Sequence, residues 1–266
     1  VSALKQLDPS KSSVNVPPDI QQLIQEFPSL LTPNFKNIKH QVEHSIHTKD
    51  SAQIHSKARP LLPGSPKAVN GKKAWDEMVK LGIVEKVSAT EQHYYSSPLH
   101  LQTKSDGSER PCGDFRLLNE QTLPDVYQLP NLNNFTSNIK RSNFFSKVDL
   151  VKAFHFIPIR DQDQLKCCVN TPWGLFKFKR LAFGLRNAPA SFQKFADEVF
   201  KDIPNVYVYL DDCLVFTDSY EEHIKTLRQI FQRLSEYGLA IALPKCAFAQ
   251  PTVDFLGYKV DNSGVT

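Results

Sequence analysis

Apolar residues recur along this chain at two spacings, and each spacing predicts a type of secondary structure. Residues 18–27, 67–81, 187–201 and 219–238 place apolar side chains three and four positions apart, which is typical of helices with one buried face. Runs rich in Val, Ile, Tyr and Phe, or alternating between polar and apolar residues, predict strands. Those runs cover residues 40–48, 82–87, 97–103, 112–118, 144–149, 157–160, 166–170, 174–179, 206–210, 213–217, 239–243 and 253–260.

Local signals support three ends of two helices. Ser219 and Glu222 have the spacing of a capping box, in which the serine side chain binds a free N–H group of the first turn. Gly82 follows the last apolar position of the 67–81 pattern and Gly238 follows that of the helix that Ser219 begins; at such positions glycine readily adopts the left-handed conformation of a C-cap. We therefore expect helices that end at these glycines.

The second half of the chain has the element order of an antiparallel sheet backed by helices. A strand that ends near Asp149 is followed by a helix, a strand–turn–strand unit over residues 206–217, a second helix and a strand. Helices that cover one face of an antiparallel sheet make an α+β fold. In such a fold, the end of the Asp149 strand lies beside the turn of the 206–217 hairpin.

Two adjacent aspartates, Asp211 and Asp212, occupy the predicted turn of this hairpin. Two-residue hairpin turns favour Asn-Gly, Asp-Gly or Gly-Gly, because both central residues need a positive φ. Neighbouring carboxylates also raise the cost of ionising both groups unless a cation lies between them. A local conflict with the folding rules indicates a functional site. The alternative is a solvent-exposed acidic turn.

The composition is that of a globular protein and disfavours several other classes. The chain has 266 residues, of which 41% are hydrophobic and 23% charged, so one large domain or two modest ones can bury a core. No apolar run approaches the ~20 residues of a membrane helix, and the N-terminus lacks a signal-peptide pattern. Five cysteines without a C-x-x-C pair disfavour a disulfide framework or zinc site and favour a reducing compartment.

The net charge of +4 is unevenly distributed along the chain. Residues 140–186 contain ten Lys or Arg against three Asp, so the remainder is slightly acidic. Aromatic residues are interleaved with these cations, and the combination fits contact with a phosphate backbone and stacked bases. The alternative is that the aromatic side chains belong to the core and that the basic strands are only solvated.

Three carboxylates are candidates for one metal site. Asp149 ends a predicted strand, and Asp211 and Asp212 lie in the turn expected beside it. Hard oxygen ligands without a histidine or thiol partner fit divalent cations. Two such ions can hold the attacking and leaving oxygens of a phosphoryl transfer. Considered alone, Asp149 fits a helix cap better than a metal ligand.

Two cations flank another predicted hairpin turn, at residues 105–108. Lys104 and Arg110 stand on either side of this turn, where they would suit a phosphate chain. An ordinary charged loop has the same pattern.

Four histidines lie close together in the sequence, at positions 40, 44, 47 and 55. On an alternating strand only His40 and His44 would share a face, and no Cys or carboxylate set completes a metal site there. We therefore expect a solvated or partner-facing strand rather than a metal site.

Five motifs occur in a fixed order and together resemble one enzyme family. They are Arg110-Pro-Cys-Gly-Asp-Phe-Arg-Leu-Leu-Asn119, Phe145-Ser-Lys-Val-Asp-Leu150, Phe183-Gly-Leu-Arg-Asn-Ala-Pro189, Tyr209-Leu-Asp-Asp212 and Phe255-Leu-Gly-Tyr258. With them the chain resembles the reverse transcriptases of long-terminal-repeat retroelements, in particular the Ty3/Gypsy retrotransposon branch, from about Phe27 onward. The resemblance implies part of a longer pol polyprotein.

The implied fold is the fingers and palm of a right-hand polymerase, of α+β class with a split βαβ-like palm and the thumb largely absent. Residues 1–30 would form an N-terminal leader and a short helix. The fingers would comprise residues 31–122 and 157–187. The palm would comprise residues 123–156, with the Asp149 strand, and 188–266, with the Asp211–Asp212 hairpin and a primer-grip hairpin.

The resemblance also implies roles for individual residues. Asp149, Asp211 and Asp212 match the catalytic aspartates, and two Mg²⁺ ions, replaceable by Mn²⁺, would be held by Asp149, Asp211 and the carbonyl group of Leu150. Lys245 matches a general acid for the leaving group. The nucleotide-binding positions are Lys104, Arg110, Ala153, Phe154 and Phe183. The template- or primer-binding positions are Asp114, Arg116, Gln193, Tyr209, Phe255, Leu256, Gly257 and Tyr258.

Two positions depart from the family pattern. Phe154 replaces the more usual Tyr at the position that excludes a ribose 2′-hydroxyl, which keeps the steric bulk and loses a hydroxyl. Ala182 stands where the family generally has Pro, a change that affects the stiffness of a turn more than the chemistry.

The implied function is an RNA- and DNA-templated DNA polymerase that adds deoxynucleotides to a primer 3′-hydroxyl during retroelement replication. Its partners would be an RNA template, a DNA template or primer, deoxynucleoside triphosphates, and the connection and RNase H regions of the same polyprotein. A homodimer is one assembly to consider, and no membrane is involved. The location would be a cytoplasmic virus-like particle, with the nucleus as the alternative.

Two other functions compete with this hypothesis. A domesticated or truncated, catalytically silent remnant would bind nucleic acid or a partner without chemistry, but all three aspartates are present. An RNA-dependent RNA polymerase with a similar palm is disfavoured by the bulky Phe154.

Overall fold

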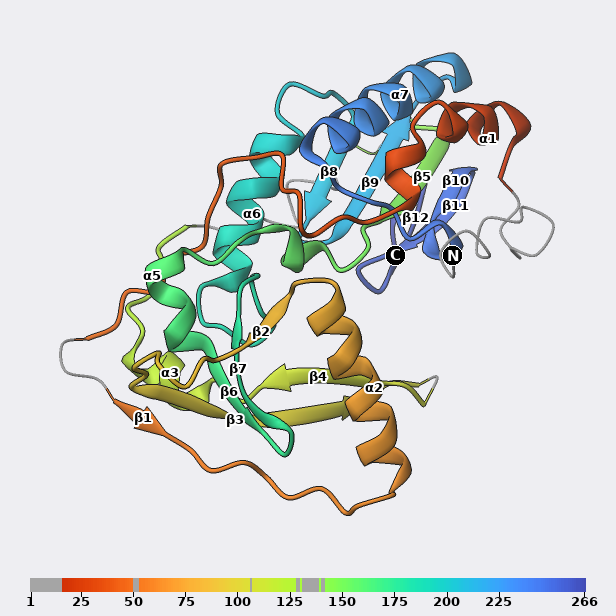
Figure 1. Cartoon of the computed structure of the whole chain (residues 1–266). Helices are drawn as coiled ribbons and strands as arrows, with labels where there is room; N and C mark the ends of the chain where they lie inside the picture. Colours follow the sequence, from red (N-terminus) through yellow and green to blue (C-terminus); the bar gives the residue numbers. More distant parts are fainter. Residues whose placement is uncertain (1–15, 50–52, 106, 128–129, 131–138, 140–141) are drawn as a thin grey trace. The chain divides into compact units, whose positions relative to one another are not determined.

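The computed structural model describes residues 16–49, 53–105, 107–127, 130, 139 and 142–266 (Figure 1). Most of the predicted leader therefore lies outside the described residues. The chain divides into two compact units, each assembled from separate segments. Unit 1 comprises Val1–His40, Tyr127–Ala153 and Phe192–Thr266, and unit 2 comprises Gln41–Val126 and Phe154–Ser191.

Unit 1 is built on a four-stranded antiparallel sheet in the order β10-β5-β9-β8. Its strands are β5 (Phe144–Asp149), β8 (Val206–Tyr209), β9 (Asp212–Thr217) and β10 (Ala247–Gln250). The helices of this unit are α1 (Pro18–Gln25), α7 (Tyr220–Tyr237) and the greater part of α6 (Ala188–Val199). Figure 1 shows α7 along β8 and β9, which is the predicted helix-backed sheet.

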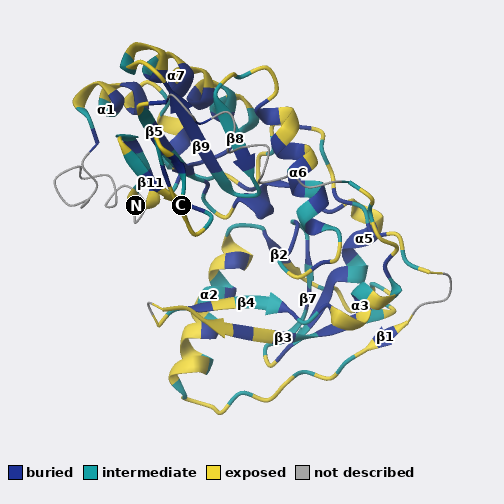
Figure 2. Cartoon of the chain, turned by 180° about the vertical axis from the view of Figure 1, so that it is seen from behind, coloured by how far each residue is buried: buried dark blue, intermediate teal, exposed yellow. Residues whose placement is uncertain are grey.

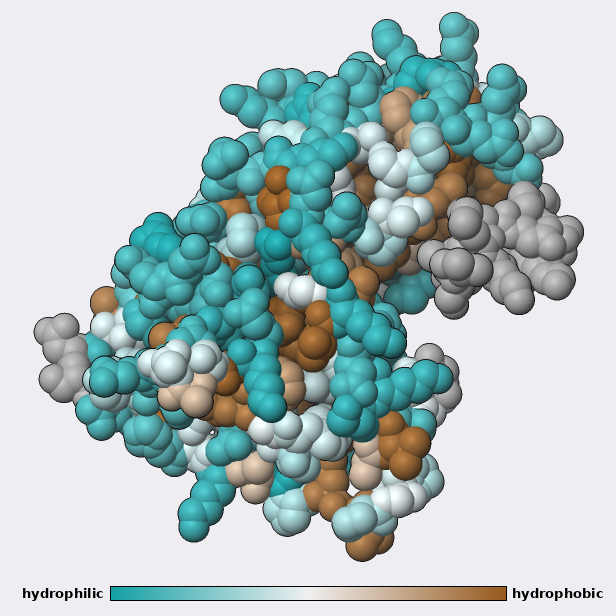
Figure 3. Space-filling model, in the orientation of Figure 1, coloured by the Kyte–Doolittle hydropathy of each residue, from teal (hydrophilic) through white to brown (hydrophobic). Residues whose placement is uncertain are grey.

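The caps of α7 are those that its sequence predicts. The side chain of Ser219 accepts a hydrogen bond from the backbone N–H of Glu222, and Gly238 ends the helix with a φ of 75°. The inward face carries Leu227, Ile230 and Phe231, all fully buried. Hydrophilic side chains cover most of the visible outer surface of α1 and α7 (Figure 3). The 3.6-residue period therefore located both the buried face and the ends of this helix.

A three-stranded antiparallel sheet completes unit 1. It contains β11 (Thr252–Phe255), β12 (Tyr258–Asp261) and β13 (Gly264–Val265), so the apolar run predicted as one strand over 253–260 is a hairpin. Its turn residues Leu256 and Gly257 have φ of 52° and 84°, as a type I′ hairpin turn requires. Val253, Phe255 and Val260 join Phe145, Leu214 and Phe216 of the first sheet in one apolar cluster.

Unit 2 contains a six-stranded mixed sheet in the order β1-β3-β6-β7-β2, with β4 paired to β3. The strands are β1 (Ile54–His55), β2 (Val84–Lys86), β3 (Tyr95–Thr103), β4 (Glu109–Gly113), β6 (Cys168–Thr171) and β7 (Gly174–Phe178). Helix α2 (Pro66–Lys80) packs on it through Trp75, whose ring meets those of Phe176 and Phe178 edge-on at 5.5 and 6.0 Å. Figure 2 shows the strands of both units mostly in the colours of buried and partly buried residues.

Short elements fill the remaining connections. They are α3 (Arg116–Gln121), α5 (Asp161–Gln164) and the 3-10 turns η2 (Pro28–Leu31), η3 (Ala153–Phe156), η4 (Leu165–Cys167) and η5 (Leu243–Lys245). Within the described ranges, no helix has the length and apolar content that a bilayer crossing requires.

Several predicted strands are wrong or displaced. The strand expected over 112–118 ends at Gly113, and α3 begins at Arg116, whose backbone N–H contacts the Asp114 carboxylate at 3.4 Å. Segments 40–48, 157–160 and 239–243 contain only isolated bridges. Strand β10 was missed because its sequence, Ala-Phe-Ala-Gln, has no β-branched residue, and its pairing with β5 is irregular.

The histidine prediction is also wrong, because two of the four side chains are buried. In unit 1 the His40 ring packs against Phe195, with ring centroids 4.4 Å apart. In unit 2 the His44 Nδ1 lies 2.7 Å from the hydroxyl of Ser191. These two histidines are packed, hydrogen-bonded or ring-stacked core groups, and the alternating pattern of residues 40–48 does not describe a solvated strand.

A third buried histidine, His223, ties α7 to the sheet. Its two ring nitrogens lie 2.6 Å from the Ser146 hydroxyl on β5 and 2.9 Å from the Thr217 hydroxyl on β9. Burial lowers the pKa of His223 to about 4, so the imidazole is neutral in the folded protein.

Acid should therefore destabilise the fold through His223. Between its ordinary pKa of 6.5 and about 4, the unfolded chain binds a proton at this position that the folded chain does not. The free energy of unfolding should fall by roughly 1–3 kcal/mol over this pH range. Urea titrations at several pH values measure this fall, and H223Q should flatten the slope relative to wild type. Equal slopes in the two proteins would contradict the prediction.

Candidate active site

Strands β5 and β9 bring two of the three predicted aspartates together. In the antiparallel register Asp149 at the end of β5 pairs directly with Asp212 at the start of β9. Tyr209 pairs with Asp212 across the hairpin, so Leu210 and Asp211 are the central turn residues. The prediction that both aspartates occupy the turn is therefore wrong by one residue. Like charges opposite one another destabilise a sheet, so this arrangement is costly without compensation.

The Asp149 carboxylate lies in a half-buried position among other charges. Burial raises its pKa above the ordinary value, Lys245 lowers it, and the neighbouring Asp212 and Asp211 raise it further. The Lys245 Nζ lies 3.8 Å from the Asp149 Oδ1, so the predicted general acid is beside the predicted metal ligand. The Asp149 carbonyl accepts a hydrogen bond of 2.8 Å from the Ala242 N–H, which fixes the strand end.

The other two aspartates have different contacts. The Asp212 carboxylate forms a 3.0 Å ion pair with Nζ of Lys147, and about a quarter of each side chain is exposed. The backbone carbonyl of Asp211 accepts a hydrogen bond of 3.4 Å from the N–H of the buried Leu150. Lys147 had no predicted role, although its position two residues before Asp149 places it on the same face of β5.

The predicted convergence of three carboxylates is not seen as a complete metal site. Among the residues described, no three His, Cys, Asp or Glu side chains are grouped so that they could hold a metal ion. Asp212 is paired with Lys147 instead. The donor chemistry nevertheless fits a hard divalent cation, since Asp149 and Asp211 offer carboxylate oxygens, and burial together with the charges of Asp212 and Asp211 raises the pKa of Asp149.

Gln193 lies under the hairpin rather than at a surface. Its side chain is fully buried and its amide contacts the backbone of Val208 and Leu210. The predicted template contact is therefore not available to this side chain in its present position.

The predicted primer-grip residues fall into two groups. Phe255 is buried at 1% exposure in the apolar cluster, so it supports the hairpin and offers no surface. Gly257 and Tyr258 at the tip are exposed, and Leu256 is half-buried. Tyr209, at the end of β8, is also half-buried. The outer tip of the β11–β12 hairpin is thus the part of this motif that can meet a partner.

In unit 2, three predicted nucleotide-binding side chains contact one another. The Arg110 guanidinium lies over the Phe183 ring, 5.2 Å from its centroid. The Phe183 and Phe154 rings are 4.8 Å apart between centroids, and Phe154 is 6% exposed. Lys104 is exposed at the β3–β4 turn, while Ala153 is buried in unit 1. A cation held on an aromatic face remains able to bind an anion through its N–H groups.

Asp114 and Arg116 form a compact ion-pair network with a residue that the sequence analysis missed. Two nitrogens of Arg116 donate to the Asp114 carboxylate at 2.8 and 2.7 Å, and Arg59 binds the same carboxylate. These contacts, with Arg116 as the larger cause, hold the pKa of Asp114 well below its usual range. Asp114 therefore positions two arginines, and the largely exposed Arg116 is the member that can face a ligand.

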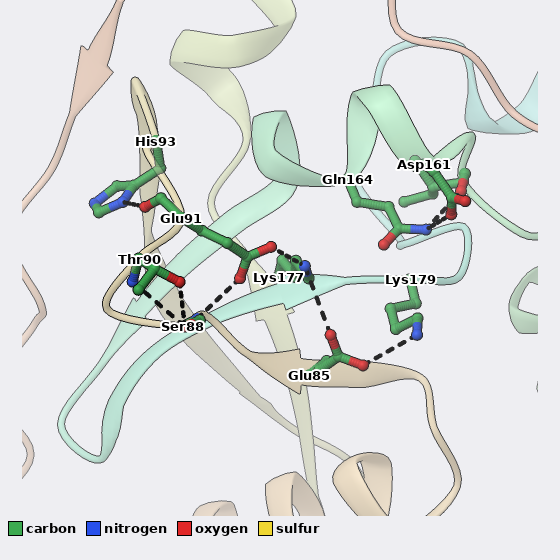
Figure 4. Close-up of polar contacts among 10 residues, drawn as sticks. Glu85, Ser88, Thr90, Glu91, His93, Asp161, Gln164, Lys177 and Lys179 are labelled. Atoms are coloured by element: carbon green, nitrogen blue, oxygen red, sulfur yellow. Dashed lines mark hydrogen bonds and ion pairs between the residues drawn. The ribbon is translucent and has the colours of Figure 1, made fainter.

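Three lysines of the basic stretch form ion pairs with carboxylates of unit 2. Lys177 is bound to Glu91 and lies 3.5 Å from Glu85, and Lys179 contacts Glu85 at 3.0 Å (Figure 4). Lys166 pairs with the buried Asp163 at 2.8 Å. For these lysines the structure favours the alternative of a scaffold role, because their charges are already compensated.

Comparisons with known proteins agree with this geometry. A family model described as "Reverse transcriptase (RNA-dependent DNA polymerase)" matches residues 102–260. The chain is 32% identical to the "Retrovirus-related Pol polyprotein from transposon opus" of Drosophila melanogaster, over 92% of this chain and 25% of that protein. It is 28% identical to the "Transposon Tf2-3 polyprotein" of Schizosaccharomyces pombe, over 96% of this chain and 19% of that protein.

The fold also has a solved counterpart. A foamy viral protease-reverse transcriptase in complex with double-stranded DNA superposes with a TM-score of 0.82 at 22% identity, over 95% of this chain and 44% of that one. The fold predicted from the five motifs is thereby confirmed. The chain spans a quarter or less of the length of the two polyproteins that it matches.

Removing the Asp149 charge should stabilise the fold. Since burial and negative neighbours raise the pKa of Asp149, its ionised form is unfavourable in the folded protein at neutral pH. D149N should raise the free energy of unfolding by up to about 1 kcal/mol at pH 7 without divalent cations. The gain should vanish as pH falls towards the ordinary carboxyl pKa of 3.8, where the folded and unfolded chains both protonate Asp149.

Thermal unfolding of both proteins between pH 3.5 and 7 measures this difference. As a control of opposite sign, K147M removes the cation next to Asp212 and should lower stability by about 0.5 kcal/mol. A destabilised D149N at pH 7 would contradict the electrostatic account of the site.

Proposed function

The chain belongs to the reverse transcriptase family, and on that premise we propose that it is the fingers-and-palm part of an RNA- and DNA-templated DNA polymerase of a Ty3/Gypsy-type retrotransposon. The reaction adds deoxynucleotides to a primer 3′-hydroxyl. The observation that carries this proposal is the pairing of Asp149 with Asp212 across β5 and β9, with Asp211 in the adjoining turn and Lys245 close by.

Unit 1 supplies the catalytic residues in this proposal and corresponds to the palm. Asp149, Asp211 and the carbonyl of Leu150 would hold two Mg²⁺ ions, or Mn²⁺ in their place, which supply Lewis-acid chemistry for phosphoryl transfer. Asp212 keeps the site negative while Lys147 limits its repulsion of Asp149. Lys245, with a side chain 70% exposed, holds a proton at Nζ that it can give to the departing pyrophosphate.

Unit 2 corresponds to the fingers and binds the incoming nucleotide. Lys104 and Arg110 on the β3–β4 hairpin bind the triphosphate, and the Phe183 ring orients the Arg110 guanidinium. The Phe154 ring, packed on Phe183, excludes a ribose 2′-hydroxyl by its bulk. Ala153, the remaining residue of the predicted nucleotide-binding set, is buried immediately before Phe154 in the sequence.

Template and primer meet the exposed members of the predicted set. Arg116, oriented by Asp114, can bind a template phosphate. Tyr209 and the tip residues Leu256, Gly257 and Tyr258 contact the primer end. The foamy viral protein of similar fold is in complex with double-stranded DNA, which supports a nucleic-acid duplex as the partner.

The biological setting extends the same proposal. The chain acts beside connection and RNase H regions of one polyprotein, in cytoplasmic virus-like particles or the nucleus, and a homodimer is the assembly to test. The intact acidic triad is the reason to prefer a polymerase over a catalytically silent nucleic-acid-binding remnant.

Primer extension tests the polymerase directly. With Mg²⁺, deoxynucleotides and a primed RNA or DNA template, the chain should extend the primer, and D211N should slow extension on the order of 10³-fold through lost charge stabilisation. D218N, which removes an exposed carboxylate after the far end of β9, is the matched control and should retain activity. Template binding without extension, both by this chain and by a longer polypeptide that carries it, would favour the silent remnant.

Sugar selection tests the role of Phe154. F154V should raise ribonucleotide incorporation relative to deoxynucleotide incorporation by about 10-fold or more, because the ring that fills the space of a 2′-hydroxyl is lost. Single-nucleotide incorporation with each sugar measures the ratio. F156V removes a similarly buried ring from the same 3-10 turn and should leave the ratio unchanged. The same ratio in F154V and wild type would exclude this role.

A further inference from the structure

The turn that carries Asp211 follows an edge strand of the sheet. Strand β8 is the last strand of its sheet, so one side of its backbone has no strand partner there. Unpaired N–H and C=O groups on an edge need other partners or water. The turn itself is also demanding, because Leu210 has a φ of 54°, a left-handed conformation that L-residues with a side chain rarely adopt. Additional contacts must therefore stabilise this turn conformation.

Gln193 on α6 supplies the missing partner from inside the protein. Its Nε2 donates to the Val208 carbonyl at 3.2 Å, and its Oε1 accepts from the Leu210 N–H at 3.1 Å. The Gln193 carboxamide thus binds the C=O of Val208 and the N–H of Leu210, two residues further along the chain. A residue of a parallel neighbouring strand makes the same pair of bonds. The carboxamide therefore replaces one residue of an absent strand.

The orientation of this carboxamide is determined by its surroundings. Its Nε2 also donates to Asp197 Oδ1 at 2.9 Å, one helical turn along α6. The amide nitrogen thus faces two acceptors and the amide oxygen faces one donor, whereas the reversed amide would place oxygen against oxygen. Asp197 is itself bound by the Tyr127 hydroxyl. The side chain is fully buried, so water does not compete for these bonds.

The same contacts determine where Asp211 stands. The residue before it is held at its N–H by Gln193, and its own carbonyl accepts from the N–H of Leu150. Between these two ties the backbone of Asp211 has little freedom. We propose that Gln193 is a positioning residue of the polymerase, which keeps Asp211 in register with Asp149 by completing the edge of β8. This inference rests on the proposed function and adds to it a residue that touches neither substrate nor metal.

Substitution by methionine, of similar length and shape, tests the proposal. Q193M removes both backbone bonds and should lower kcat for deoxynucleotide addition about 10- to 100-fold, because a small displacement of a catalytic group has effects of this size. The KM for the nucleotide should stay within about 3-fold, since the triphosphate contacts are made by other residues. Equal kcat values for Q193M and wild type would overturn the proposal.

A control on the same helix separates positioning from loss of packing. Phe195 is fully buried and packs against the rings of His40 and Tyr237. F195L should lower the melting temperature but keep kcat within about 3-fold of wild type well below that temperature. A loss of kcat in F195L as large as in Q193M would show that any loosening of α6 inactivates the protein, and would also overturn the proposal.

Amide hydrogen exchange of the wild-type protein tests the proposal without an activity assay and without a folded variant. In wild type the Leu210 N–H should exchange at least about 10-fold more slowly than an open turn amide, because its acceptor is a buried side chain. In folded Q193M this protection should be lost, while that of β9 amides persists. An unprotected Leu210 amide in wild type would overturn the proposal even if primer extension succeeds. A protected amide, with no extension either by this chain or by a longer polypeptide that carries it, would leave the positioning intact and contradict the proposed function.

Discussion

The pairing of Asp149 with Asp212 across two central strands is the constraint around which unit 1 is arranged. Antiparallel register sets these carboxylates opposite each other, where like charges oppose sheet formation. Two lysines moderate the cost: Lys147 binds Asp212 directly, and Lys245 lies within 4 Å of Asp149. Because neither cation cancels the effect of burial, the pKa of Asp149 remains raised. The charges of the site therefore destabilise the fold, and the remainder of the unit must compensate for this.

This compensation comes from apolar burial and from hydrogen bonds that restrict the backbone. Behind the acidic end, β5 and β9 carry the fully buried Phe145 and Leu214, which join the apolar cluster. A Leu in the left-handed region and a Gln that substitutes for a strand residue shape the turn itself. Natural sites often break local rules where function requires it, and the left-handed Leu210 and the opposed Asp149 and Asp212 are such breaks beside Asp211.

The sequence alone predicted many elements of this fold. Period and capping signals located α1, α2, α6 and α7, and β-prone runs located β5, β8 and β9. The order of five motifs indicated the family and the polymerase fold. Prediction failed where a local pattern was overruled by distant partners. His44 was expected at a surface but binds Ser191, and Lys177, counted among the free cations of a basic stretch, is held by Glu85 and Glu91.

The sequence by itself determined which residues are candidates for the chemistry, because residue type and order along the chain are local information. Only the tertiary structure decided their register. Whether Leu210 or Asp212 shares the turn with Asp211 depends on how β9 pairs with β5 and β8, and this pairing is made of backbone hydrogen bonds that no single segment encodes. The same holds for Gln193: the family resemblance implied a template contact, and the structure instead buries its side chain against the backbone of Val208 and Leu210.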